Sequence, residues 1–214
     1  MRTRFSLAGL WPCALAAVIG LLVAPFAGAA EPPSSFNTFE ITPYVGYMAG
    51  GEFEESGGAD LDLDADTNLG VIFNVAADHW RRYELLYSNQ GAKVDGSAPF
   101  DMDVEYLQIG GIVSHPMAER AIPYFGITVG ATRFSPEAAG MNNETEFSFT
   151  VGAGLHIPIT DHIGVRFDAR AFVTLLDGDS EIFCASDNGA ACRVRAKSDT
   201  FLQYAAALGV TFGF

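Results

Sequence analysis

The sequence is poor in lysine and cysteine and, beyond its first 30 residues, in long apolar runs. It has two lysines, Lys93 and Lys197, and 12 basic residues against 26 acidic ones, so its formal net charge is −14. Because sequence-independent binding to nucleic acid needs Lys and Arg to neutralise phosphates, no nucleic-acid partner is expected. Three cysteines in 214 residues are too few for a disulfide scaffold. The composition instead predicts a chain that folds as one domain.

The first 30 residues have the pattern of a secretory signal peptide. Arg2 and Arg4 precede an apolar stretch that ends in the small residues Ala27-Gly28-Ala29, which form a cleavage site. An uncleaved membrane anchor is the alternative, but two prolines and the small-residue end argue against it. We expect residues 1–30 to be removed, which leaves a short periplasmic N-terminal segment, 31–38, before a folded domain at 39–214.

Beyond residue 38 the sequence alternates between apolar and polar residues with the period of a β-strand. In the clearest segment Phe147, Phe149 and Val151 alternate with Ser148 and Thr150. The segments are longer than the five to six residues of an average strand and match the 9–11 residues with which a tilted strand crosses a bilayer. Eight strands are predicted, at 39–50, 67–78, 80–90, 102–114, 121–134, 145–158, 161–175 and 200–214.

The connections between these segments are alternately long and short. The long ones are 51–66, 91–101, 135–144 and 176–199, and a short one separates each from the next. An up-and-down barrel of the outer membrane has an even number of strands, short periplasmic turns and longer extracellular loops. The expected fold class is therefore all-β, as a transmembrane antiparallel up-and-down β-barrel of eight strands with four extracellular loops.

A soluble β-sandwich or a lipocalin-like barrel would show the same alternation. Lysine usage favours the membrane barrel, because strand faces that meet water usually carry Lys and Glu, whereas both lysines fall in predicted long loops. The polar strand faces consist largely of Gly, Ser, Thr, Asn and Gln, which fit a narrow lumen. Aromatic residues near the segment ends are expected to form interfacial girdles; these are Phe39, Trp80, Tyr83, Tyr124, Phe134 and Phe214.

Several stretches of the predicted strands carry a family resemblance when they are taken in their order along the chain. They are Tyr83–Ser88, Val104–Gly111, Pro123–Gly130, Val151–Leu155 and Gly164–Arg170. Together they resemble the eight-stranded outer-membrane β-barrel proteins, the group that includes the outer membrane protein A transmembrane domain. The resemblance covers almost all of residues 39 to 214 and implies an integral protein of the Gram-negative outer membrane.

The end of the sequence adds to this resemblance. Phe212 and Phe214 are similar to the C-terminal signal that the barrel-insertion machinery reads in such proteins, which would make this machinery a partner during biogenesis. Larger members continue into a periplasmic peptidoglycan-binding domain. Because this sequence ends at Phe214, no such C-terminal domain is expected.

Charged residues recur on the polar side of two predicted strands. Arg166, Asp168 and Arg170 alternate with apolar residues, and Arg82 and Glu84 do the same on another strand. Side chains nearly fill the interior of an eight-stranded barrel, so these charges must pair with one another. Two interpretations remain open: a salt-bridged plug, or a gate in which exchange of partners opens a narrow ion path.

The long loops carry two further candidates. Asp60, Asp62, Asp64 and Asp66 alternate in the first loop and could hold Ca²⁺, although the Gly and Glu of a calcium-binding loop are missing, so a solvated acidic loop is favoured. Cys184 and Cys192, in the last loop, are predicted to form a disulfide in an oxidising compartment. Beside them Arg193, Arg195 and Lys197 form a basic cluster, either as ordinary loop charge or as a contact for lipid phosphates or a partner.

An enzyme is the least favoured interpretation. Some eight-stranded barrels modify lipid A with His and Ser near the outer leaflet, but the four histidines here map to predicted periplasmic turns or to the strand ends beside them. Their spacing fits no metal site, and no cofactor is expected. They are His79, His115, His156 and His162.

Three functional classes therefore remain, of which a lipid A-modifying enzyme is the least favoured. The first is a structural or surface-interaction barrel that contributes to membrane integrity, adhesion or partner binding through its loops. The second is a small pore or carrier for ions or small hydrophobic molecules, for which glycines in the lumen would leave room; these are Gly126, Gly130, Gly152, Gly154 and Gly209. The expected partners are outer-membrane lipids, lipopolysaccharide and an extracellular partner of the loops, and the barrel is expected to be a monomer.

Overall fold

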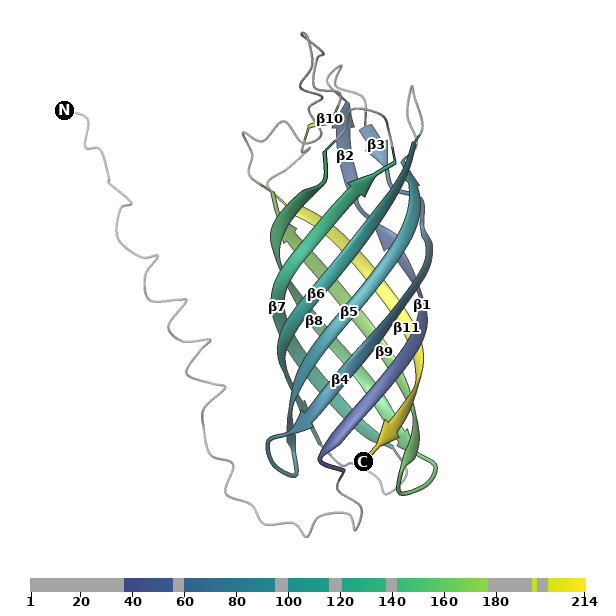
Figure 1. Ribbon diagram of the computed structural model, residues 1–214, viewed down its shortest axis with the longest axis vertical. Helices are drawn as coiled ribbons and strands as arrows, with labels where there is room; N and C mark the ends of the chain where they lie inside the picture. Colours follow the sequence, from purple (N-terminus) through teal and green to yellow (C-terminus); the bar gives the residue numbers. More distant parts are fainter. Residues whose placement is uncertain are drawn as a thin grey trace, which may run out of the picture. The chain divides into compact units, whose positions relative to one another are not determined.

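A closed antiparallel barrel of eight strands forms the folded domain (Figure 1). The computed structural model describes residues 37–55, 60–94, 100–115, 121–137, 142–176, 194–195 and 200–214. The strands are β1 (Phe39–Gly50), β4 (Asp66–Ala76), β5 (Arg81–Val94), β6 (Phe100–Ser114), β7 (Ile122–Pro136), β8 (Glu144–Pro158), β9 (Ile163–Leu175) and β11 (Thr200–Gly213). Each strand pairs with its neighbours in the chain, and β1 pairs with β11 to close the barrel. The predicted fold class and all eight strands are confirmed.

Some strands run further toward the loops than the sequence indicated. β5 continues to Val94 and β6 starts at Phe100, so their connection is 95–99 instead of 91–101. Lys93, expected in a loop, therefore lies in β5 opposite Asp101 of β6. Backbone pairing does not depend on an apolar outward side chain, so the ladder of hydrogen bonds continues past the end of the apolar pattern.

A second, smaller sheet forms from two segments that were expected to be loops. It consists of β2 (Glu52–Glu55), β3 (Asp60–Asp62) and β10 (Val194–Arg195), with β2 in the centre. Gly50 and Gly51, with φ of 93° and 103°, turn the chain from β1 toward β2 in a conformation that residues with a Cβ rarely adopt. Because β2 pairs with β10, the first and the last long loop are joined to each other.

The strand register sets the stagger of the barrel. From Leu69 on β4, paired residues lead one way round to Thr145 of β8 and the other way round to Leu155 of the same strand. This offset of ten residues is the shear that tilts the strands of a closed barrel. Eight strands at this stagger enclose a lumen just wide enough to be filled with side chains.

The two faces of the barrel wall reverse the pattern of a soluble protein. Outward positions expose large apolar side chains, among them Leu69, Ile109 and Phe147, whereas inward positions bury polar ones such as Asn74 and Gln108. Lipid accepts an apolar outer surface, and inward polar side chains can hydrogen-bond to one another within the lumen. Within the described residues, no helix has the length and apolar character to cross a membrane.

Candidate functional site

Four charged residues from opposite sides of the barrel meet in the half of the lumen that lies toward the short turns. Arg166, Asp168 and Arg170 alternate on the inward face of β9, and Glu84 reaches them from β5. Glu84 accepts one hydrogen bond from Arg166 and one from Arg170, each of 2.8 Å. Asp168 pairs with the same two arginines at 2.7 and 2.8 Å. All four side chains are at most 6% exposed, so this lumenal charge cluster is two buried cations neutralised by two buried anions.

Two neutral residues complete the surroundings of Arg166. Its Nε donates to the Tyr124 hydroxyl at 2.8 Å, its Nη1 donates to Asn74 Oδ1 at 2.9 Å, and its guanidinium lies over the Tyr124 ring at 4.4 Å. Every part of the guanidinium is therefore engaged, as a buried charge requires. Tyr124 was expected in an interfacial girdle, and this prediction is wrong because its side chain points into the lumen. Tyr124 lies two and four residues before Gly126 and Thr128 in β7, so it shares their inward face.

The fifth expected member, Arg82, forms a separate pair. It contacts Glu40 of β1 at 3.0 Å and donates to the carbonyl oxygen of Asn37 at 3.2 Å, nearer the ends of the strands. Glu40 is 5% exposed and was not singled out from the sequence. It stands beside Phe39 and Ile41, whose side chains point outward, so alternation alone could have placed it in the lumen.

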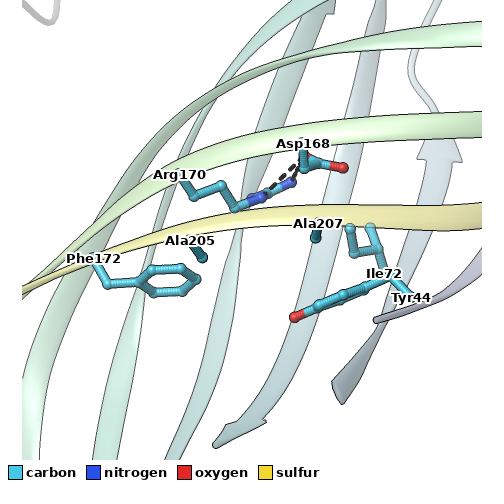
Figure 2. Close-up of a pocket in the computed structure, with 7 residues that line it drawn as sticks. All are labelled: Tyr44, Ile72, Asp168, Arg170, Phe172, Ala205 and Ala207. Atoms are coloured by element: carbon cyan, nitrogen blue, oxygen red, sulfur yellow. Dashed lines mark hydrogen bonds and ion pairs between the residues drawn. The ribbon is translucent and has the colours of Figure 1, made fainter. Parts of the chain in front are cut away.

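Little free space remains next to the charge cluster. A cavity of about 10 Å³ has Asp168 and Arg170 on one side and Phe172 and Tyr44 on the other (Figure 2). This is about the volume that a single water molecule needs. At each of the five glycines expected to leave room in the lumen, an added Cβ would come within 3 Å of a neighbouring atom. At Gly154, for example, it would overlap the Tyr124 hydroxyl, so this glycine makes space for a tyrosine instead of for a ligand.

A belt of amides and hydroxyls lies next along the lumen. Tyr106 donates to Gln203 at 2.6 Å, and Gln203 donates to Gln90 at 2.9 Å, which links β6, β11 and β5 across the interior. Gln108 donates to Ser148 at 2.6 Å. The partners come from strands that are not adjacent in the barrel. Their side chains therefore reach across the lumen and fill it.

The lumen toward the long loops is filled by an apolar cluster that was not predicted from the sequence. Phe134 and Phe201 are at most 1% exposed and meet edge to face with ring centroids 5.1 Å apart. Phe134 was expected in an interfacial girdle, which is wrong because its side chain points inward. Leu63 and Leu176, from the first and last long loops, pack into the same cluster. The other members are Met48, Ile72, Leu86, Ala92, Val94, Met102, Val104, Tyr106 and Phe172.

The metal and disulfide candidates do not form a described site. Asp60 and Asp62 lie in β3, and Asp64 and Asp66 follow with exposed side chains just before and at the start of β4. Across the side chains that the structure describes, no group of three His, Cys, Asp or Glu is arranged to hold a metal. Cys184 and Cys192, like the loop residues Arg193 and Lys197, lie outside the described residues.

The histidines and the C-terminus occupy the short-turn end. His79, His115 and His162 lie in or next to connections between strands, and His156 lies near the end of β8. Phe212 and Phe214 are 39% and 72% exposed on the outer surface. The carbonyl oxygen of Phe214 accepts from the backbone amides of Thr38 and Phe39 at 3.0 and 3.2 Å, which ties the end of the last barrel strand to the start of the first.

Comparisons with known proteins agree with this architecture. Residues 13–212 match the outer membrane protein beta-barrel domain family. No curated protein matches the sequence at a significant level. Among solved structures, Neisserial surface protein A is similar at 13% identity and a TM-score of 0.59, over 83% of this chain and 97% of that one. The outer membrane protein OprG from Pseudomonas aeruginosa is similar at 15% identity and a TM-score of 0.57, over 84% of this chain and 98% of that one.

At these identities the two solved structures establish the fold alone. The match to the family model shows more than the fold, because it spans most of the sequence. It includes all eight strands of the barrel except the last residue of β11. It agrees with the closed barrel and with the apolar outer surface. This chain therefore belongs to the outer membrane protein beta-barrel domain family and is an integral protein of the outer membrane.

Proposed function

We propose that this protein is a non-conducting outer-membrane barrel with a structural or surface-interaction role. The observation that carries the proposal is the filled lumen. The charge cluster, the amide belt and the apolar cluster follow one another along the interior, and the cavity beside Arg170 has room for about one water molecule. A path for hydrated ions would have to displace buried ion pairs, which is costly.

The long loops supply the surface for such a role. The first and last loops pair through β2 and β10, where Arg195 stands opposite Glu54 in the register. This pairing joins the most acidic loop to the loop that holds the basic cluster. Two long loops held together present a more defined surface to an extracellular partner than two separate ones, and loops on a rigid scaffold commonly carry binding. Membrane integrity, adhesion and partner binding are the roles that this surface supports.

Planar-bilayer conductance tests the proposal directly. The refolded protein is expected to insert without discrete current steps, and Arg166→Ala is expected to remain silent while its resistance to unfolding falls. Arg81→Ala is a suitable control, because this exposed arginine lies outside the lumen at the short-turn end. Discrete steps in the wild type that change with Arg166→Ala and not with Arg81→Ala would contradict the proposal and favour a gated pore.

A carrier for small hydrophobic molecules is the second candidate, favoured by the apolar cluster at the loop end. Met48 and Met102 in this cluster are adaptable side chains that could repack around an apolar guest. Vesicle uptake of an apolar fluorescent probe distinguishes the two proposals. A carrier predicts uptake that Phe134→Ala changes, whereas the surface-interaction role predicts loss of partner binding on loop deletion and no uptake.

The proposal includes no enzymatic activity. A hydrolase that acts on outer-leaflet lipid would need a general base at the loop end, close to a nucleophile. The four histidines lie at the opposite end of the strands, where His162 Nδ1 is 3.2 Å from the Gly213 carbonyl oxygen. Their position supports a role in turns and strand ends.

A further inference from the structure

The apolar outer surface of the barrel is tall on the side formed by β9 and β11. On β9 every outward side chain from Ile163 to Leu175 is apolar, and on β11 every outward side chain from Leu202 to Phe212 is apolar or aromatic. Both runs are at least as long as the 9–11 residues with which a tilted strand crosses a bilayer. This side of the barrel therefore matches the full thickness of the hydrocarbon.

The opposite side, formed by β5 and β6, has a much shorter apolar surface. The outward side chains are apolar or aromatic only from Tyr83 to Tyr87 on β5, and the outward run from Leu107 to Val113 on β6 includes Gly111. Counted from the short turns, the outward apolar run ends at the seventh residue of β5, whereas the run on β9 ends at the thirteenth residue. At a rise of about 3.3 Å per residue and a tilt of about 45°, the difference is about 14 Å along the membrane normal.

Polar rows replace the missing apolar surface and run across three adjacent strands. Asn89, Glu105 and Arg133 are register partners on β5, β6 and β7. Tyr87 donates to Glu105 at 2.7 Å, and Arg133 lies 3.9 Å from the same carboxylate with 53% of its side chain exposed. The next rows toward the loops are also polar or lack a side chain. We call these outward residues the β5–β7 polar face: Asn89, Gly91, Lys93, Asp101, Asp103, Glu105, Arg133 and Ser135.

The position of this face restricts what can cover it. Charged side chains on the lipid face of a barrel destabilise it, and the cost grows with depth in the membrane. The row of this face nearest the short turns, formed by Asn89, Glu105 and Arg133, must therefore meet polar material at a depth where β9 and β11 still meet hydrocarbon. A second copy of the chain fits poorly, because a two-fold interface centred on β6 would set Asp103 and Glu105 against the same carboxylates of the other copy.

A headgroup from the outer leaflet fits the charges better. Arg133 and Lys93 stand on either side of the acidic strand β6 and offer charge-assisted hydrogen bonds to phosphate. The carboxylates between them can accept hydrogen bonds from sugar hydroxyls, and a divalent cation can bridge a carboxylate to a phosphate through oxygen ligands. Phosphate groups and sugar hydroxyls occur together in a phosphorylated glycolipid such as lipopolysaccharide.

We propose that the β5–β7 polar face docks the phosphorylated sugar headgroup of an outer-leaflet glycolipid, which lies deeper in the membrane there than around the rest of the barrel. Arg133 makes the main contact with phosphate, and Lys93 adds a second one nearer the loops. The proposal rests on the outer-membrane location and on the uneven apolar surface. It holds whether the lumen conducts or not.

Binding of labelled, purified lipopolysaccharide to the refolded protein in detergent micelles tests the proposal. Arg133→Ser is expected to weaken binding about tenfold, as loss of a charge-assisted hydrogen bond predicts. Arg81→Ser is a matched control, because its side chain is 58% exposed, close to the 53% of Arg133, but lies at the short-turn end. It is expected to leave binding unchanged. Arg133→Lys, which keeps the charge, is expected to restore part of the affinity.

Two further measurements separate the alternatives. Dephosphorylated lipopolysaccharide is expected to bind the wild type and Arg133→Ser equally, because the phosphate contact is then absent from both. Equal binding of intact lipopolysaccharide by the wild type, Arg133→Ser and Arg81→Ser would overturn the proposal. A wild-type dimer in light scattering that Arg133→Ser converts to a monomer without any change in lipopolysaccharide binding would overturn it in favour of a second copy.

Discussion

The two ends of the lumen are filled by opposite kinds of chemistry. Toward the short turns, Arg166 and Glu84 belong to a cluster of four buried charges, whereas toward the long loops Phe134 and Phe201 belong to an apolar core. Both ends exclude free space, but they differ in what holds them together. Each charge depends on specific partners at hydrogen-bond distance, while the apolar end depends on total volume and shape.

This difference predicts how each end responds to substitution. Removal of one charge leaves its partners buried and uncompensated, so the effect should spread to the whole cluster. Removal of one apolar side chain leaves a cavity whose cost depends on how far its neighbours relax. The comparison can be tested by single substitutions in each end, by replacement of the whole charge cluster, and by an ion pair outside the lumen.

The largest effect is expected for Arg166→Met. This substitution keeps much of the side-chain volume but leaves Glu84 and Asp168 with only Arg170 as a cationic partner. A loss of about 3–5 kcal/mol in the free energy of unfolding is expected, as for other buried ion pairs that lose one partner. Urea unfolding in lipid vesicles measures it. A loss below about 1 kcal/mol would mean that the charges are not held as a buried, mutually dependent set.

At the loop end, Phe134→Ala is expected to cost about 3 kcal/mol, because it removes a fully buried ring that packs on Phe201. Phe134→Leu, which retains most of the apolar volume, should cost less than about 1.5 kcal/mol. The same urea titration gives both values. If the two variants lose equal stability, the apolar cluster depends on one particular ring geometry instead of on filled volume.

Replacement of the whole charge cluster sharpens the contrast. A variant with Glu84→Leu, Asp168→Leu, Arg166→Met and Arg170→Met carries no unpaired buried charge, so its loss of stability is expected to be below about 2 kcal/mol, less than for Arg166→Met alone. The comparison is made by urea unfolding of both variants side by side. A greater loss for the fourfold variant would show that the ion pairs add stability beyond mutual neutralisation.

The smallest effect is expected for an ion pair outside the lumen. Asp78, in the turn before β5, accepts hydrogen bonds from the side chain of Arg81 at 2.6 Å and from the backbone amide of Arg81 at 2.8 Å. The hydrogen bond from the Arg81 side chain lowers the pKa of this partly exposed carboxyl below its ordinary value of 3.8. Asp78→Asn is expected to cost less than about 1 kcal/mol at pH 7.

The pH dependence of this pair follows from the direction of its pKa shift. A lowered pKa in the folded state means that the contribution is fully present above the ordinary value of 3.8 and is lost as the pH falls through the lower folded value. The wild type and Asp78→Asn should therefore differ in unfolding midpoint at pH 7 and converge in strong acid. A difference that persists in acid would point to the hydrogen bonds of the turn instead of the charge.

Alternation in the sequence was sufficient for the barrel and for the direction in which most side chains point. It placed Arg166, Asp168 and Arg170 together on the inner face of one strand, and the structure brings Glu84 to them from β5. It could not say that Arg82 would pair with Glu40, because the partner of an inward charge depends on the shear of the barrel and on which strand lies opposite.

Two aromatic residues face the opposite way from the one predicted. Tyr124 and Phe134 stand near segment ends, as girdle residues do, yet both point inward and are buried. Successive side chains of a strand point to opposite faces, so the alternation around each residue decides its face, and its distance from the strand end does not. The apolar cluster was missed for a related reason, since inward positions were expected to be polar throughout.

The sequence by itself determined the fold class, the strand number and the location. The alternation of apolar and polar residues and the lengths of the connections can both be read directly along the chain. Only the tertiary structure decided how the lumen is filled, how the first and last loops join, and how the apolar surface is shortened on β5 and β6. These features depend on which residues meet across a closed, staggered wall. Register and shear decide which residues come into contact, and neither can be deduced from one segment of the sequence alone.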